Sequence, residues 1–93
     1  MDFEWDEAKD RANVAKHGVG FETAKRIFEG TILTRQDSRR DYGETRHTSV
    51  GRVGPAVLVV AHTRRGANLR LISARPASRK EREAYHEHTQ KGP

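Results

Sequence analysis

The chain contains no cysteine among its 93 residues, so disulfide bonds and thiolate metal sites are excluded. It also lacks a long apolar segment. The longest continuous run, residues 56–61 (AVLVVA), is far shorter than the ~18–20 residues needed to span a membrane. The N-terminus is acidic and has no hydrophobic signal region. These absences predict a cytoplasmic protein with no membrane partner.

Apolar residues of all kinds are scarce. They make up 33% of the sequence, and the mean hydropathy is −0.93. A folded chain of 10.6 kDa buries roughly 60–65% of the surface that it exposes when unfolded. That is enough for one hydrophobic core, so we expect a single domain over residues 1–93. The apolar residues are patterned rather than scattered, which argues against disorder.

Basic residues are abundant and unevenly placed. Eighteen Lys and Arg face thirteen Asp and Glu, which gives a net charge of +5, and thirteen of the eighteen are Arg. The guanidinium group is a planar fork of donors that suits phosphates and carboxylates. Acids crowd the first ten residues, whereas residues 62–82 hold seven basic side chains and one acid. This asymmetry indicates a basic face for a polyanion or an acidic protein, with a merely solvated surface as the alternative.

Start and stop signals predict three helices, over residues 7–16, 21–29 and 79–88. Asp6 is a candidate N-cap for the first helix, and Gly18 follows its end. Ser78 and Glu81 have the spacing of a capping box that begins the third helix. Residues 90–93 are expected to fray.

Short apolar or alternating runs predict strands at residues 31–36, 46–52, 56–61 and 69–74, with Phe3 and Trp5 in an edge strand or an extended lead-in. The run at 56–61 reads as the central strand, buried on both faces, and residues 37–44 as a charged loop. The order predicts an α+β fold with two N-terminal helices, an antiparallel sheet of three or four strands, and a C-terminal helix. We expect the helices to cover one face of the sheet.

Patterns typical of metal sites and of common hydrolases are absent. His86 and His88 point roughly 200° apart on a helix, so they cannot chelate one ion. The other three histidines have no partner at ligand spacing. The sequence has no G-x-S-x-G elbow and no P-loop. We therefore expect neither a metal nor a cofactor.

The segment 68–85 (NLRLISARPASRKEREAY) concentrates the candidates for anion binding. It predicts a strand that leads into a helix, whose N-terminus adds free N–H groups and its positive dipole end. Two arginines and a tyrosine of that helix are spaced to share one face. Ion pairing with neighbouring glutamates is the alternative reading. The predicted oxyanion clamp comprises Arg75, Arg79 and Arg82 with Tyr85 as a stacking group, and Arg70 is a further candidate in the same segment.

Two further places hold candidate groups. Lys16 and His17 end the first predicted helix, where cations complement the helix dipole, and histidine is also the natural acid–base group at neutral pH. Arg64 lies just beyond the central strand, where ordinary hairpin polarity would also explain it. Each residue therefore has both a structural and a functional interpretation.

The order of several segments carries a family resemblance. They are FEWDEAK at 3–9, KHGV at 16–19, FETA at 21–24, R-x-x-x-x-G at 46–51, VLVVAHT at 57–63 and RLISARPASRKEREAY at 70–85. In this order they resemble the BrnT family of small toxins, a branch of the RelE-like ribonuclease superfamily. The resemblance covers nearly the full length and implies a RelE-like fold.

The resemblance implies a ribonuclease that arrests growth and needs no metal. The RNA's own 2′-OH would attack the adjacent phosphate and leave a 2′,3′-cyclic end. Arg75 and Arg79 would stabilise the phosphorane, with Arg64 also at the catalytic site, and Lys16 or His17 would transfer protons. The groups expected to bind RNA are Arg70, Arg82 and Tyr85, the last by stacking on a base.

The implied partners are an RNA substrate and a ribbon-helix-helix antitoxin similar to BrnA. Operator DNA would be bound indirectly, through the antitoxin, and a homodimer is left open. The rival hypothesis is a non-catalytic basic module that docks the antitoxin and DNA for transcriptional autoregulation, because the same arginines would serve it. A third reading, a helix-based DNA reader, has no recognisable recognition helix to support it.

Overall fold

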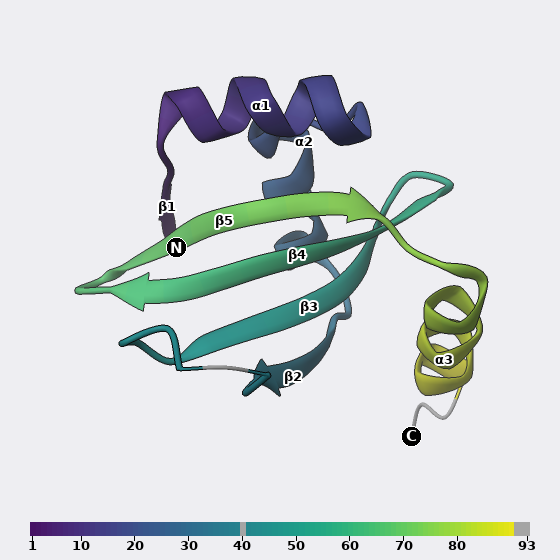
Figure 1. Cartoon of the computed structure of the whole chain (residues 1–93). Helices are drawn as coiled ribbons and strands as arrows, with labels where there is room; N and C mark the ends of the chain where they lie inside the picture. The colour runs from purple at the N-terminus through teal and green to yellow at the C-terminus, as the bar shows by residue number, and fades with distance from the viewer. Residues whose placement is uncertain (40, 91–93) are drawn as a thin grey trace.

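The computed structural model describes residues 1–39 and 41–90, and shows a mixed α+β fold (Figure 1). The predicted fold class is therefore confirmed. Of the segment expected to fray, residues 91–93 lie outside the described part. The elements in chain order are β1 (Asp2–Glu4), α1 (Glu7–His17), α2 (Phe21–Ala24), the 3-10 helix η1 (Lys25–Glu29), β2 (Leu33–Asp37), β3 (Arg46–Val53), β4 (Ala56–Arg65), β5 (Asn68–Pro76) and α3 (Arg79–Gln90).

The sheet has five strands in the order β1-β5-β4-β3-β2, not the three or four expected. Strands β2 to β5 form the predicted antiparallel meander, but β1 pairs in parallel with β5, so the sheet is mixed. Phe3 lies opposite Leu69 in that pair and packs on Phe28, with the ring centroids 5.6 Å apart. Contacts with residues far away in the chain determine which strand β1 pairs with, so the local sequence pattern could not predict this pairing.

The first helix begins and ends where the sequence predicts. The carboxylate of Asp6 accepts hydrogen bonds from the backbone N–H groups of Ala8 (2.8 Å) and Lys9 (3.1 Å). Gly18 ends the helix with φ = 73°, a conformation that glycine adopts without steric cost.

The second predicted helix is α-helical only through Ala24 and continues as the 3-10 helix η1. Phe21, Ala24 and Ile27 recur every third residue, and all three are fully buried. In a 3-10 helix, side chains three apart lie directly above one another. The tighter winding therefore keeps Ile27 on the face that Ala24 buries.

The main core lies between these N-terminal helices and one face of the sheet. The buried side chains Leu58, Val60, Leu71 and Ala74 of the sheet pack against those of α2 and η1. Asn13 fixes α1 to the edge of β5: its amide donates to the Ala74 carbonyl (2.7 Å) and accepts from the Ala74 N–H (3.1 Å). In Figure 1, α1 runs along the β5 side while α2 and η1 lie behind the sheet.

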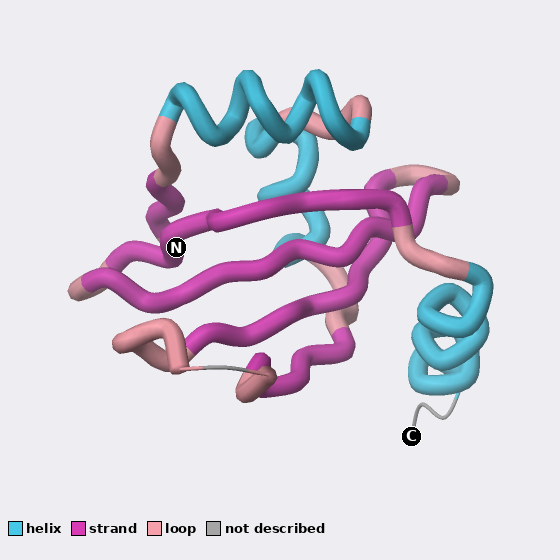
Figure 2. The backbone as a smooth tube through the Cα atoms, viewed as in Figure 1, coloured by secondary structure: helices cyan, strands magenta, loops and turns pink. Residues whose placement is uncertain are grey.

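The last helix packs on the opposite face, so the expectation that helices cover a single face is wrong. Tyr85 and Ala77 form a second core with Val57 and Val59, which alternate along β4 with Leu58 and Val60. The predicted burial of the central strand on both faces is thereby confirmed. A short loop after β5 turns the chain into α3, beside the ends of the strands (Figure 2). Much of this second face is left without a helix over it.

No helix among the described residues combines the length and apolarity needed to cross a membrane. The capping box at the start of α3 is present as predicted. The Ser78 N–H donates to a carboxylate oxygen of Glu81 (2.7 Å), and the Glu81 N–H donates to the Ser78 hydroxyl (3.2 Å).

Gly51 is expected to be intolerant of a side chain, because a Cβ there would lie 2.7 Å from Cβ of Ile27. Gly51→Ala should lower the free energy of unfolding by about 1–3 kcal/mol through overpacking. Thermal unfolding followed by circular dichroism measures this, at about 4–8 °C per kcal/mol for a domain of this size. Gly30→Ala is the matched control, since a Cβ there meets nothing within 4 Å. Equal losses in the two variants would contradict the packing explanation.

Candidate functional site

The uncovered part of the second sheet face forms a cleft of about 610 Å³ against α3. Val50 and Val59 are among the apolar residues that line it. Strand β2 and the residues after it form one side, and β5 with the start of α3 forms the other. The basic side chains lining the cleft are Arg35, Arg39, Arg75 and Lys80, and the acids are Asp37 and Glu81.

Arg75 is held in a fixed orientation by the first turn of α3. Its Nη1 and Nη2 atoms donate to the two carboxylate oxygens of Glu81 at 2.7 and 2.8 Å, and Nη1 also donates to the Pro76 carbonyl at 3.3 Å. The hydrogen bond that Arg75 donates lowers the pKa of Glu81 to about 2, so this carboxylate stays ionised. A guanidinium has five N–H donors. After these three bonds, two donors of Arg75 remain for a ligand.

Arg39 is held in the same way on the opposite side. Its Nε and Nη2 atoms donate to the two carboxylate oxygens of Asp37 at 2.9 and 3.0 Å. The hydrogen bond from Arg39 lowers the pKa of Asp37 to about 2. Glu81 raises the pKa of Arg75 and the positive charge of Arg39 acts against that rise, so the two guanidiniums interact electrostatically.

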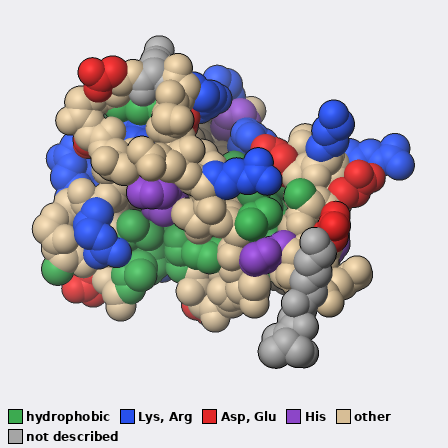
Figure 3. Space-filling model, turned by 90° about the horizontal axis from the view of Figure 1, so that it is seen from below, with side chains coloured by type: hydrophobic (Ala, Val, Ile, Leu, Met, Phe, Trp, Pro, Cys, Tyr) green, Lys and Arg blue, Asp and Glu red, His purple; other side chains and the backbone are tan. Residues whose placement is uncertain are grey.

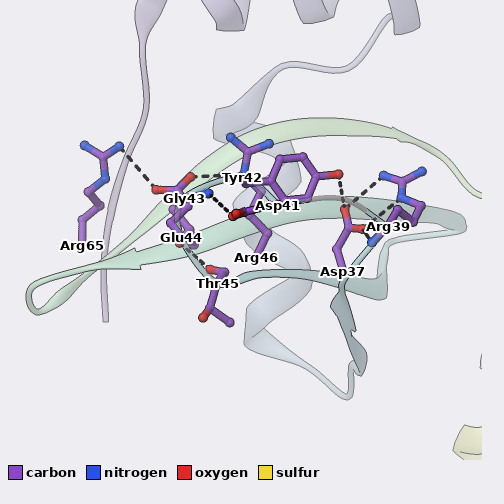
Figure 4. Close-up of polar contacts among 10 residues, drawn as sticks. Asp37, Arg39, Asp41, Tyr42, Gly43, Glu44, Thr45, Arg46 and Arg65 are labelled. Atoms are coloured by element: carbon purple, nitrogen blue, oxygen red, sulfur yellow. Dashed lines mark hydrogen bonds and ion pairs between the residues drawn. The ribbon is translucent and has the colours of Figure 1, made fainter.

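A chain of contacts fixes the β2–β3 connection that carries Arg39 (Figure 4). The Tyr42 hydroxyl donates to Asp37 (3.2 Å), and the guanidinium of Arg46 lies 4.1 Å from the centre of the Tyr42 ring. Arg46 also pairs with Glu44 (3.1 Å), and Glu44 with Arg65 at the end of β4 (3.7 Å). These contacts join the connection to β2, β3 and β4 and so position one side of the cleft.

The cleft has an excess of positive charge. Its four cationic side chains outnumber its two carboxylates, and each carboxylate is already occupied by an arginine. The side chains of Arg35 and Lys80 have no hydrogen-bond or ion-pair partner among the described residues. A view from below shows basic side chains at several places on the surface, with acids beside some of them and apolar side chains between (Figure 3). The arrangement suits a phosphate-bearing ligand, because guanidinium forks match phosphate oxygens.

The predicted clamp is only partly assembled. Arg75 lines the cleft, but Arg79 is 86% exposed and pairs with Glu83 one helical turn away. Arg82 donates to the Ala77 carbonyl (3.0 Å) at the bend into α3. Tyr85 is buried in the second core and its hydroxyl donates to the Thr31 carbonyl (2.8 Å). This burial leaves no open ring face on which a base could stack.

The remaining predicted site residues lie elsewhere. Arg70 pairs with Glu4 of β1 (2.7 Å), and Arg64 lines a separate cavity. Lys16 and His17 end α1, which runs along the edge of β5, and no side-chain contact of the described residues joins them to Arg75. The structure therefore does not bring the end of α1 into the cleft.

Sequence reasoning missed Arg35 and Arg39. Leu33, Arg35 and Asp37 alternate along β2, so they share the face that lines the cleft, and the pairing of Arg35 with Thr48 sets their position. The alternation was a usable signal. The pairing of β2 with β3, which places these side chains opposite Arg75, could not be predicted from the sequence alone.

No group of three or more His, Asp or Glu side chains in the described part of the chain is arranged to hold a metal ion. His47 and His62 have stacked rings whose centroids lie 6.0 Å apart. The cleft itself contains two carboxylates, both committed to arginines.

The Arg75–Glu81 pair makes stability depend on pH in a defined direction. Because the folded pKa of Glu81 is about 2, below its ordinary 4.5, the stabilisation is present above pH 4.5 and is lost as the pH falls toward 2. Glu81→Gln should lower the free energy of unfolding by about 1 kcal/mol at pH 7. Urea unfolding at pH 7 and at pH 3 measures the difference from wild type, which should shrink in acid. Glu83→Gln, which removes an exposed pair from the same helix, is the control; an equal loss there would contradict the prediction.

Comparison with protein families identifies the chain. The family model for BrnT, described as the ribonuclease toxin of a type II toxin–antitoxin system, matches residues 5–81. No curated protein matches the chain. The matched range includes Arg35, Arg39, Arg75 and Glu81, and therefore most of the cleft. Because the match extends over more than half of the sequence, the chain belongs to the BrnT family of ribonuclease toxins of type II toxin–antitoxin systems.

Proposed function

We propose that the cleft beside α3 is where this toxin cleaves RNA, by attack of the substrate's own 2′-OH on the adjacent phosphate. The observation that supports this most directly is Arg75, a half-exposed guanidinium locked by Glu81 in a cleft with three more cations. A phosphodiester in this cleft would face positive charge from both sides. The proposal extends the family's ribonuclease activity to a specific place and mechanism.

The reaction forms a bond between O2′ and phosphorus and breaks the bond between phosphorus and O5′. The products are a 2′,3′-cyclic phosphate and a free 5′-OH; O2′ loses one proton and O5′ gains one. Negative charge grows on the phosphoryl oxygens in the pentacoordinate transition state. Preorganised donors stabilise that charge without further reorganisation, typically by about 3 kcal/mol per donor. The fixed Arg75 meets this requirement, and Arg39 would act from the other side.

The cleft offers few groups for proton transfer. Arg39 holds the pKa of Asp37, and Arg75 that of Glu81, at about 2, which makes both carboxylates weak bases. Guanidiniums do not release protons in proteins. We therefore assign to Lys80 the protonation of O5′ and to solvent the removal of the 2′ proton. Lys16 and His17 have no part in this scheme, because neither residue lines the cleft.

No metal is needed in this mechanism. A divalent cation in a nuclease neutralises the developing charge and activates a nucleophile. Here four basic side chains supply the positive charge, and the 2′-OH of the RNA is the nucleophile.

Arg75→Ala is expected to lower kcat for RNA cleavage about 10²–10³-fold, because it removes a preorganised donor from the phosphorane. The assay follows cleavage of a single-stranded RNA in excess EDTA, where wild type should stay active. A 2′-deoxy nucleotide at the cleavage position should block the reaction. Arg11→Ala, an exposed arginine on α1 that lines none of the cavities, is the matched control. Undiminished cleavage by Arg75→Ala, with native circular dichroism, would rule out the proposed site.

The same cleft is also the best candidate for the antitoxin's binding surface. We infer a ribbon-helix-helix antitoxin that covers the cleft with acidic side chains and binds operator DNA on behalf of the complex. The net charge of +5 and the unpaired Arg35 and Lys80 support an acidic partner. We also infer a homodimer of the toxin within this complex, because most soluble oligomers are symmetric and two-fold dimers are the commonest form.

Antitoxin binding is expected to protect the cleft. Hydrogen exchange of the complex should slow at the backbone amides of β2 and of the first turn of α3, relative to the free toxin. The amides of α1 serve as the internal control, because no residue of that helix lines the cleft. Protection confined to α1, with the cleft unchanged, would contradict the assignment.

A further inference from the structure

A second polar cavity, of about 470 Å³, lies on the face of the sheet that carries the N-terminal helices. None of the residues that line it also lines the cleft. Its residues include Thr34 of β2, His47 of β3, and His62 and Arg64 of β4. His62, expected from the sequence to follow the central strand, instead lies within β4 and is 7% exposed.

The buried histidine at this cavity is fixed by a chain of hydrogen bonds. Nε2 of His62 shares a 2.7 Å hydrogen bond with the hydroxyl of Ser49, which shares another of 2.7 Å with the hydroxyl of Thr34. The ring of Phe28 packs edge-on against the imidazole, with the centroids 5.2 Å apart. The orientation of His62 is therefore set by contacts on several sides.

The second ring nitrogen of His62 is open to the cavity. Nδ1 has no hydrogen-bond partner, yet no side-chain nitrogen or oxygen in the described part of the chain is both sealed from solvent and unsatisfied. Nδ1 must therefore reach solvent, and the cavity that His62 lines is where it can do so. This preoriented polar atom is available to a ligand.

The cavity is electrostatically suited to an anion. Burial, with the nearby His47 and Arg64, lowers the pKa of His62 to about 4, so the ring is neutral at pH 7. Arg64 is exposed, and its side chain has no hydrogen-bond or ion-pair partner among the described residues. The one acid in the lining, Glu44, is already paired with Arg46 and Arg65. A guanidinium and two imidazoles thus remain for a phosphate.

The two cavities lie on opposite sides of the same two strands. Thr34 and Arg35 are consecutive in β2, as are His47 and Thr48 in β3, and in each pair one residue lines each cavity. Strand β2 is at the edge of the sheet, so no further strand blocks the way around it. A flexible single strand that occupies the cleft can continue around this edge.

We propose that the cavity formed by His47, His62 and Arg64 binds a second phosphate group of the RNA strand whose scissile phosphate occupies the cleft. This rests on the proposed function, and it adds a binding subsite remote from the reaction. The subsite does not take part in bond breaking. It increases affinity for strands long enough to span both faces.

Substrate length separates this subsite from the site of reaction. A dinucleotide reaches the cleft alone, whereas an oligonucleotide of about ten nucleotides, within the usual range of single-strand sites, reaches both. Arg64→Ala and His47→Ala should each raise KM for the longer RNA about tenfold, with kcat unchanged. Neither should affect the dinucleotide. The slope of log affinity against log salt should fall by about 0.7 for Arg64→Ala, the value for one phosphate contact on a single strand.

Direct binding is measured on a 2′-deoxy analogue of the longer strand, which cannot be cleaved. The imidazole NMR signals of His47 and His62 should shift in wild type and in Arg75→Ala, but not in Arg64→Ala. Inorganic phosphate serves as the probe for a free anion. If inorganic phosphate shifted these signals as far as the 2′-deoxy strand does at the same concentration, the cavity would bind any phosphate, and its assignment to RNA would be overturned. Arg11→Ala is the matched control, because it removes the same charge from α1.

The outcomes distinguish failure of the subsite from failure of the proposed reaction site. An unchanged KM for the longer RNA in both Arg64→Ala and His47→Ala would overturn the subsite alone. Loss of kcat on the dinucleotide in these variants would also overturn it, and would move the chemistry to the histidine cavity. If Arg75→Ala leaves cleavage undiminished while Arg64→Ala and His47→Ala behave as expected, the proposed reaction site is overturned. The binding measurement then still tests the subsite.

Discussion

The bidentate pair between Arg75 and Glu81 is the interaction on which the functional face depends. It joins the last strand to the last helix through two hydrogen bonds of 2.7 and 2.8 Å. Glu81 is also the acceptor in the capping box that begins α3, so one carboxylate both starts the helix and holds the arginine. The direction in which α3 leaves the sheet, and therefore one side of the cleft, follows from this arrangement. On the other side, Asp37 holds Arg39 by the same geometry.

The two faces of the sheet have different tasks. One is covered by α2 and η1 and supplies most of the hydrophobic core, so its polar cavity is confined to the end near β2. The other is only partly covered by α3, which leaves the cationic cleft open. A small protein with 33% hydrophobic residues cannot bury both faces fully. The uncovered area is thus a consequence of composition, and the family's ribonuclease activity gives it a use.

Local signals in the sequence were reliable where short-range chemistry decides the outcome. The Asp6 cap, the stop at Gly18, the Ser78–Glu81 capping box and the buried central strand all appear as expected. Where a distant partner decides, local signals were not enough. They predicted an edge strand at Phe3 but not its pairing with β5, and the expectation of helices on one face was wrong because α3 docks on the second. Likewise the arginines of residues 68–85, close in sequence, are divided among the cleft, β1 and solvent.

The sequence by itself determined that this protein is small, basic, free of cysteine and of the α+β class, and its ordered motifs indicated its family. Those properties follow from composition and from interactions within a few residues. Only the tertiary structure decided which basic groups share a cleft. Arg35 and Arg39 line one cleft with Arg75 because strand register and the packing of α3 bring the two sides together, whereas Lys16 and His17 lie outside it because α1 runs along the edge of β5. Charges cluster where side chains are close in space. Spacing along the chain determines that closeness only within a single helix or strand.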